Sequence, residues 1–181
     1  MSSAKKFVLL GATGSIGEST LQVLRKHPEK LELIGVSAHK QKKKLYSIIE
    51  EFKVPNAHLA CQSDQTVSFP KETILGQSTD QLDELAAHPE ADLVVVAIVG
   101  SAGLRPTLAA LKAGKDVVLA NKESLVLGGQ LVTDTARESG ARIIPADSEH
   151  NAIHQCLLGQ EERELDSIIL TASGGAFRDL P

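Results

Sequence analysis

Residues 7–17 read FVLLGATGSIG. An apolar run typical of a buried strand passes directly into a glycine-rich turn, and a helix is predicted from Glu18 to Lys26. The glycines let the backbone turn sharply and approach a pyrophosphate, while the helix N-terminus offers free N–H groups to the phosphates. The spacing is GxxGxxG rather than the commoner GxGxxG, and the alternative is a glycine turn that serves packing alone. We interpret the segment as a nucleotide site because it lies in the first strand–turn–helix of the chain.

Strand-like and helix-like segments alternate along the rest of the chain. Further strands are predicted at residues 31–37, 57–61, 73–75, 92–99, 116–120 and 142–145, and helices at residues 41–52, 80–87, 102–113 and 125–139. Repeated β-α-β units predict an α/β fold, a Rossmann-like doubly wound parallel sheet with helices on both faces. We assign residues 1–146 to this nucleotide-binding domain.

The sequence changes character after Pro145. A polar run, a helix ending near Leu158 and a strand at residues 167–170 are predicted there. We interpret residues 147–181 as the start of a second, α+β catalytic domain. The chain is therefore expected to be the N-terminal part of a longer protein.

Composition excludes some classes of function. Of the 181 residues, 42% are hydrophobic and 23% charged, as in ordinary soluble domains. The net charge of -4 gives no reason to expect a nucleic acid partner, and no apolar run is long enough to span a membrane. Cys61 and Cys156 lie far apart without metal spacing, which indicates reduced thiols in a cytoplasmic compartment.

The end of the predicted strand at residues 31–37 indicates which nucleotide binds. NAD sites place a carboxylate there to accept hydrogen bonds from the ribose 2′-hydroxyl. Here the chain instead carries His39, Lys40 and lysines at residues 42–44, a cluster that would attract a 2′-phosphate. Lysines at a helix N-terminus also oppose the helix dipole unless an anion is present. We therefore favour NADP(H) over NAD(H), the alternative being a solvated basic helix start.

Three polar or glycine-rich segments follow predicted strands. They are AIVGSAG at residues 97–103, ANKES at residues 120–124 and ADSE at residues 146–149. Ligands bind at this edge of open parallel sheets, although a plain glycine turn and a helix cap are alternatives for the first two. Asp147 and Glu149 would lie on one side of an extended segment, and two carboxylates suit Mg²⁺ or Mn²⁺. A solvated acidic pair is the alternative.

Taken together, these motifs resemble a known family. GATGSIG begins at Gly11, AIVGSAGL at Ala97, LANKESLV at Leu119, PADSEHNAI at Pro145 and LTASGG at Leu170. Their order and spacing resemble the N-terminal part of the 1-deoxy-D-xylulose 5-phosphate reductoisomerases, and LANKES and DSEHNAI are highly specific to that family. These enzymes use NADPH to form 2-C-methyl-D-erythritol 4-phosphate in non-mevalonate isoprenoid biosynthesis. The third metal carboxylate, the lid and the C-terminal helical domain are expected beyond Pro181.

The resemblance implies a role for each matching position. Cofactor contacts are implied for Gly11, Thr13, Gly14, Ser15, Ile16, Ser37, Ala38, His39, Lys40, Ala97, Ile98, Val99, Asn121 and Glu123. Substrate contacts are implied for Lys122, Ser148 and Ser173, of which Lys122 and Ser148 are catalytic, and Asp147 and Glu149 are implied metal ligands. The implied cofactors are NADPH and Mn²⁺ or Mg²⁺, and the substrate is a sugar phosphate. The full-length enzyme is expected to be a cytoplasmic homodimer, and this chain alone an inactive monomer or weak dimer.

Two other interpretations remain open from the sequence. One is a different NADP-dependent Rossmann reductase, such as a semialdehyde dehydrogenase, whose catalytic cysteine could only be Cys156, within a predicted helix. The other is a nucleotide-binding module without catalysis.

Overall fold

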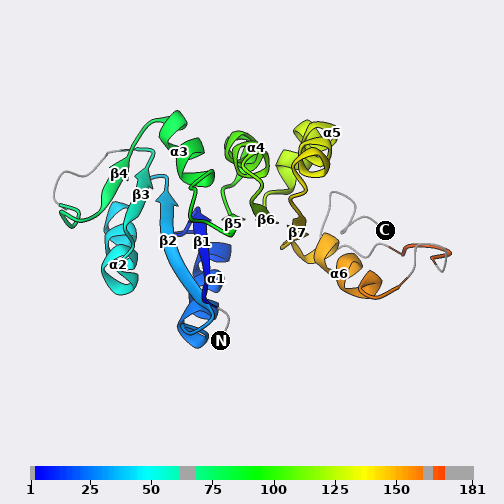
Figure 1. Ribbon diagram of the computed structural model, residues 1–181, viewed down its shortest axis with the longest axis horizontal. Helices are drawn as coiled ribbons and strands as arrows, with labels where there is room; N and C mark the ends of the chain where they lie inside the picture. The colour runs from blue at the N-terminus through cyan, green and yellow to red at the C-terminus, as the bar shows by residue number, and fades with distance from the viewer. Residues whose placement is uncertain (1–2, 62–67, 161–164, 170–181) are drawn as a thin grey trace, which may run out of the picture.

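The computed structural model describes residues 3–61, 68–160 and 165–169. Over these residues seven parallel strands form one sheet in the order β4-β3-β2-β1-β5-β6-β7 (Figure 1). The strands are β1 (Lys5–Leu10), β2 (Leu31–Ala38), β3 (Asn56–Leu59), β4 (Ile74–Gly76), β5 (Leu93–Val96), β6 (Asp116–Leu119) and β7 (Ile143–Pro145). The helices are α1 (Ser15–Lys26), α2 (Lys42–Phe52), α3 (Thr79–Ala86), α4 (Leu104–Lys112), α5 (Lys122–Ser139) and α6 (Ser148–Leu157), with a short 3-10 helix, η1 (Gly100–Gly103), before α4.

The helices cover both faces of the sheet. Figure 1 shows α1 and α2 on one face and α3, α4 and α5 on the other. Successive side chains of β1 serve the two layers: Phe7 and Leu9 belong to the core under α1 and α2, and Val8 and Leu10 to the core under the other three helices. This alternation is why the apolar run of β1 is continuous, and the arrangement confirms the predicted doubly wound α/β fold.

The strand order reverses at β1. From β1 the chain builds outward through β2, β3 and β4, and then returns to add β5, β6 and β7 on the other side. The carboxyl ends of β1 and β5 therefore flank the point where ligands bind in sheets of this kind. The glycine turn follows β1 and the segment from Ala97 follows β5, so both reach this crevice.

Several element boundaries differ from the sequence prediction. Helix α1 begins at Ser15 instead of Glu18 and includes Gly17. Strand β5 ends at Val96 because its partner β6 ends opposite, at Leu119, so the predicted strand at residues 92–99 is too long. The predicted strand at residues 167–170 is wrong over the described residues 167–169, which have no regular secondary structure. Among the described helices, none is long and apolar enough to cross a membrane.

We expect an ion pair at the edge of the sheet to make stability depend on pH. Asp116 at the start of β6 accepts hydrogen bonds from the backbone N–H of Arg142 at 2.9 Å and from its Nε at 3.1 Å, and these bonds lower the pKa of Asp116. Asp116→Asn should reduce the free energy of unfolding by about 1 kcal/mol at pH 7. Because a lowered carboxyl pKa stabilises the fold in full only above the ordinary value of 3.8, the difference should shrink as the pH falls below 3.8 and be lost below the lowered pKa of the folded state. Urea titrations of both proteins at pH 7 and pH 3 test this, and an equal difference at both would contradict it.

Candidate functional site

The glycine turn packs against the end of β5 with no room for a side chain. Gly11 has φ +85°, and a Cβ there would lie 2.5 Å from the carbonyl oxygen of Ala97. Its N–H donates to the carbonyl oxygen of Ser37 at 3.2 Å and to Oγ of Ser37 at 3.0 Å, which ties the turn to β2. Helix α1 then begins with Gly14 as its N-cap, which has no side chain to cap the N–H groups of the first turn. Those groups suit an anion such as a pyrophosphate.

A cavity of about 380 Å³ opens at this crevice. Nine of the residues predicted to contact the cofactor, at the ends of β1, β2 and β5, supply much of its wall: Gly11, Thr13, Gly14, Ser37, Ala38, His39, Ala97, Ile98 and Val99. Gln41, His58, Ala60, Leu82 and Ala102 complete the lining and were missed from the sequence. His58 and Ala60 are at or just after the end of β3, so the rule that ligands bind at carboxyl ends of strands could have found them.

The remaining predicted cofactor residues lie outside this lining. The side chain of Ile16 lines a different hollow, on the α1 face of the sheet, together with residues of β1 and β5. Lys40 is exposed beside the cavity, and Glu123 is half-buried in the first turn of α5. Their contacts with a cofactor, like that of Ser15, stay predictions.

The basic cluster after β2 reaches the glycine turn through Lys44. Its Nζ donates to the carbonyl oxygen of Thr13 at 3.2 Å and lies 3.4 Å from a carboxylate oxygen of Glu18. The ammonium group is thus held beside the turn where phosphates would lie. No carboxylate follows β2 before α2 begins at Lys42.

Asn121 joins the loop after β5 to the start of α5. The residue is 1% exposed. Its Oδ1 accepts hydrogen bonds from the N–H and Oγ of Ser124, and its Nδ2 donates to the carbonyl oxygens of Ile98 and Gly100, the latter at 2.9 Å. Both donors and both lone pairs of the amide are therefore occupied within the protein. The predicted cofactor contact of Asn121 would have to involve its backbone.

The predicted metal and substrate residues come together where β6 and β7 end. Nζ of Lys122, the first residue of α5, lies 3.5 Å from Oε2 of Glu149 in the first turn of α6. Asp147 is the N-cap of α6, and its Oδ1 accepts from the backbone N–H of His150 at 3.0 Å. Among the described residues, no group of three or more His, Cys, Asp or Glu side chains is arranged to hold a metal.

Both carboxylates are held ionised. Burial alone would raise the pKa of Asp147, but hydrogen bonds from the backbone N–H and ring of His150 outweigh it and lower that pKa. A hydrogen bond from Ser148, the backbone N–H of Glu149 itself and the charge of Lys122 lower the pKa of Glu149. Oxygen ligands that are anionic at neutral pH suit a hard divalent cation.

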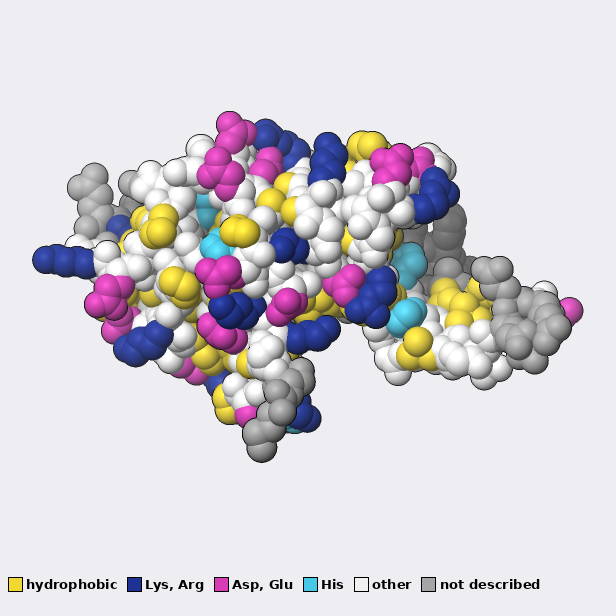
Figure 2. Space-filling view, in the orientation of Figure 1, with side chains coloured by type: hydrophobic (Ala, Val, Ile, Leu, Met, Phe, Trp, Pro, Cys, Tyr) yellow, Lys and Arg dark blue, Asp and Glu magenta, His cyan; other side chains and the backbone are white. Residues whose placement is uncertain are grey.

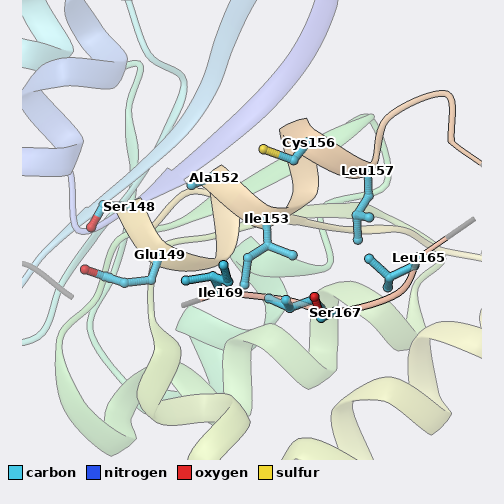
Figure 3. Close-up of a pocket in the computed structure, with 10 residues that line it drawn as sticks. Ser148, Glu149, Ala152, Ile153, Cys156, Leu157, Leu165, Ser167 and Ile169 are labelled. Atoms are coloured by element: carbon cyan, nitrogen blue, oxygen red, sulfur yellow. The ribbon is translucent and has the colours of Figure 1, made fainter. Parts of the chain in front are cut away.

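An apolar pocket of about 450 Å³ adjoins these groups. Figure 3 shows Ser148 and Glu149 at one end, with Ile153 and Leu157 of α6 facing the segment at residues 165–169. In the space-filling view hydrophobic side chains gather on the part of the molecule that α6 and residues 165–169 form. Acidic and basic side chains are interspersed over the rest of the face in view (Figure 2). The predicted substrate residue Ser173 lies outside the described residues.

Comparison with protein families identifies the chain. Residues 7–129 match the family model described as 1-deoxy-D-xylulose 5-phosphate reductoisomerase, and residues 143–181 match the model of the C-terminal domain of that enzyme. The chain belongs to the 1-deoxy-D-xylulose 5-phosphate reductoisomerase family. The predicted family is thus confirmed, which rules out the alternative reductase built on Cys156.

Individual reductoisomerases are similar to the chain over nearly its whole length. The enzyme of Ralstonia pickettii is 48% identical over 96% of this chain and 46% of its own, and that of Clostridium acetobutylicum is 46% identical over 96% and 47%. The chain thus spans about half the length of the curated relatives it matches. A crystal structure described as DOX-P reductoisomerase with fosmidomycin and magnesium aligns with a TM-score of 0.84 at 38% identity, over 98% of this chain and 48% of its own.

Another solved structure, the reductoisomerase of Zymomonas mobilis in complex with NADPH, aligns with a TM-score of 0.76 at 37% identity, over 85% of this chain and 41% of its own. A biliverdin reductase of Synechocystis, 22% identical over 86% of this chain and 42% of its own, shares only the fold, with a TM-score of 0.57.

Proposed function

We propose that this chain forms the NADPH-binding part of a 1-deoxy-D-xylulose 5-phosphate reductoisomerase and supplies its first substrate and metal groups. A protein that carries it would convert 1-deoxy-D-xylulose 5-phosphate to 2-C-methyl-D-erythritol 4-phosphate. The cavity between the ends of β1, β2 and β5 carries the proposal, because nine of the fourteen residues that match the family's cofactor positions line it together. The solved structure of the similar reductoisomerase of Zymomonas mobilis is a complex with NADPH.

The residues around the cavity suit NADPH. Gly14, the N-cap of α1, makes no side-chain cap, so the first-turn N–H groups of α1 are open to a pyrophosphate. Lys44 places a positive charge at this turn, and His39 lines the cavity at the end of β2 where the 2′-phosphate of NADPH would lie. A carboxylate at that position would repel the phosphate, and none is present among the described residues between β2 and α2.

Asp147 and Glu149 suit Mn²⁺ or Mg²⁺, the kind of ion found in the similar magnesium-bound structure. A bound metal would supply Lewis-acid stabilisation to substrate oxygens, and NADPH the hydride for reduction. Lys122, held 3.5 Å from Glu149, would place its ammonium group against the same oxygens and stabilise negative charge that develops on them. Ser148, the first residue of α6, would orient the sugar phosphate by a hydrogen bond, and Ser173 would help hold its phosphate.

A fluorescence titration of the 181-residue chain with NADPH and with NADH tests the proposal. We expect NADPH to bind at least tenfold more tightly, since the basic cluster is worth about 1.4 kcal/mol or more toward the 2′-phosphate. Asp147→Ala should weaken binding of Mn²⁺ and leave NADPH affinity unchanged, because Asp147 is not in the cofactor cavity. Binding of neither nucleotide, or equal loss of both ligands in the variant, would contradict the assignment.

We further propose that the full-length protein is a cytoplasmic homodimer. The two cysteines described, Cys61 and Cys156, are both free thiols, which agrees with a reducing compartment.

A further inference from the structure

Glu18 holds the ammonium group of Lys44 beside the glycine turn. Nζ of Lys44 lies 3.4 Å from Oε2 of Glu18 and donates to the carbonyl oxygen of Thr13 at 3.2 Å. The side chain of Lys44 is 40% exposed, so a dissolved ligand can reach it. Thr13 lines the cavity proposed for NADPH, which places this positive charge beside that cavity.

Glu18 is itself fixed from the other side by Arg25. Nη1 of Arg25 donates to Oε1 of Glu18 at 3.0 Å, and its Nε and Nη2 donate to the two carboxylate oxygens of Glu51 on α2 at 2.6 and 2.8 Å. The guanidinium also lies over the ring of Phe52, 5.5 Å from the ring centroid. The hydrogen bond from Arg25 is the largest cause that lowers the pKa of Glu18, so this carboxylate is ionised near pH 7. Each of its oxygens therefore faces a cation, and the oxygen that faces Lys44 is held in place.

The position of Lys44 in the fold shows which part of a dinucleotide would meet it. In sheets of this kind the pyrophosphate belongs at the glycine turn after β1, and the ribose with its 2′-substituent at the end of β2. Lys44 lies in the first turn of α2, the helix that follows β2, and its ammonium group contacts the glycine turn. The charge is thus placed between these two positions. A lysine side chain is long and flexible, so holding it in place before the ligand arrives reduces the entropy lost on binding.

We infer that Glu18 is a positioning residue for the 2′-phosphate of NADPH, because it keeps the ammonium group of Lys44 where that phosphate binds. Charge alone predicts the opposite effect, since a carboxylate near the site repels a phosphate. Arg25 offsets much of that repulsion by pairing with Glu18. Without Glu18, the carbonyl oxygen of Thr13 is the one partner left to Lys44 among the described residues. Because it assumes NADPH in this cavity, this role rests on the proposed function.

The test is a fluorescence titration of the 181-residue chain and its variants with NADPH and with NADH, which lacks the 2′-phosphate. The quantity compared is the ratio of the two dissociation constants. We expect Glu18→Gln to lower the preference for NADPH roughly threefold, since Lys44 must then be ordered during binding. Lys44→Met should lower the preference at least as much. Adding Glu18→Gln to Lys44→Met should cause no further loss, because no ammonium group remains to be placed.

Glu50→Gln is the matched control. It removes the same charge from an exposed position near the other end of α2, so this variant should keep the full preference. If Glu18→Gln keeps or increases the preference for NADPH, the role of Glu18 is wrong while the proposed function stands. The same follows if Glu18→Gln weakens both nucleotides equally, because a loss of packing between α1 and α2 does not depend on the 2′-phosphate. If the unaltered chain binds neither nucleotide or does not distinguish them, the proposed NADPH site fails and the role of Glu18 with it.

Discussion

Gly17→Ala is expected to lower the free energy of unfolding by about 1–3 kcal/mol, the usual cost of an overpacked site, and to weaken NADPH binding at least tenfold. Gly17 lies in the first turn of α1, where a Cβ would fall 2.5 Å from the carbonyl oxygens of both Gly11 and Ala12. Both neighbours are backbone, so the strain can be relieved only by moving the helix away from the turn. That movement would misplace the N–H groups that we propose bind the pyrophosphate.

Helix propensity alone predicts the opposite sign. Alanine is better than glycine inside a helix by about 1 kcal/mol, so an unhindered site would gain stability. Gly129 in α5 provides the matched control, because a Cβ there meets nothing within 4 Å. Urea unfolding and NADPH titration of both variants separate the two effects. If Gly17→Ala were as stable as Gly129→Ala, the close approach of α1 to the turn would not constrain this position.

The same residue explains one limit of the sequence prediction. The transition at Gly11 from an apolar run to a glycine turn was sufficient to predict β1, the turn and α1 in that order, because the hydrophobic pattern and the turn residues agree there. The helix was predicted to begin at Glu18, directly after Gly17, and glycine does disfavour helix interiors. Close packing of Gly17 against the backbone of Gly11 and Ala12 outweighs its low helix propensity. Such a contact cannot be predicted from local propensities. In the same way β5 ends at Val96 because its partner β6 ends opposite, and the sequence of β5 alone carries no information about where β6 ends.

The residues that hold the site together were harder to predict than those that line it. Thr13, Ser37 and Ala97 follow strand ends and could be recognised by position. From the sequence, Asn121 could be interpreted only as a helix cap or a cofactor contact. Its hydrogen bonds to the carbonyl oxygens of Ile98 and Gly100 could not be predicted, because they join residues more than twenty positions apart in the sequence.

Asn121→Asp is expected to lower the free energy of unfolding at pH 7 by about 2–4 kcal/mol, the cost of leaving buried acceptors unsatisfied. Aspartate caps helices as well as asparagine does, so the cap of α5 on Ser124 is preserved. A carboxylate, however, cannot donate to the carbonyl oxygens of Ile98 and Gly100, and it places a negative charge against them where only 1% of the residue is exposed. Since Ile98 lines the cofactor cavity, NADPH affinity should fall as well.

The pH dependence of stability distinguishes a residue that also bonds the two carbonyl oxygens from one that only caps α5. The new carboxyl would have a raised pKa in the folded state, because burial and the two carbonyl oxygens disfavour its charge. A raised folded pKa destabilises the variant most above that pKa, so its deficit against the unaltered chain should shrink from pH 7 toward pH 4. Ser78→Asp is the matched control, because it exchanges one good capping residue for another at the exposed N-cap of α3, where the side chain bonds no buried carbonyl oxygens. It should change the free energy of unfolding by less than about 0.5 kcal/mol. Urea titrations at the two pH values measure all three proteins, and an Asn121→Asp variant as stable as Ser78→Asp would mean that Asn121 only caps α5.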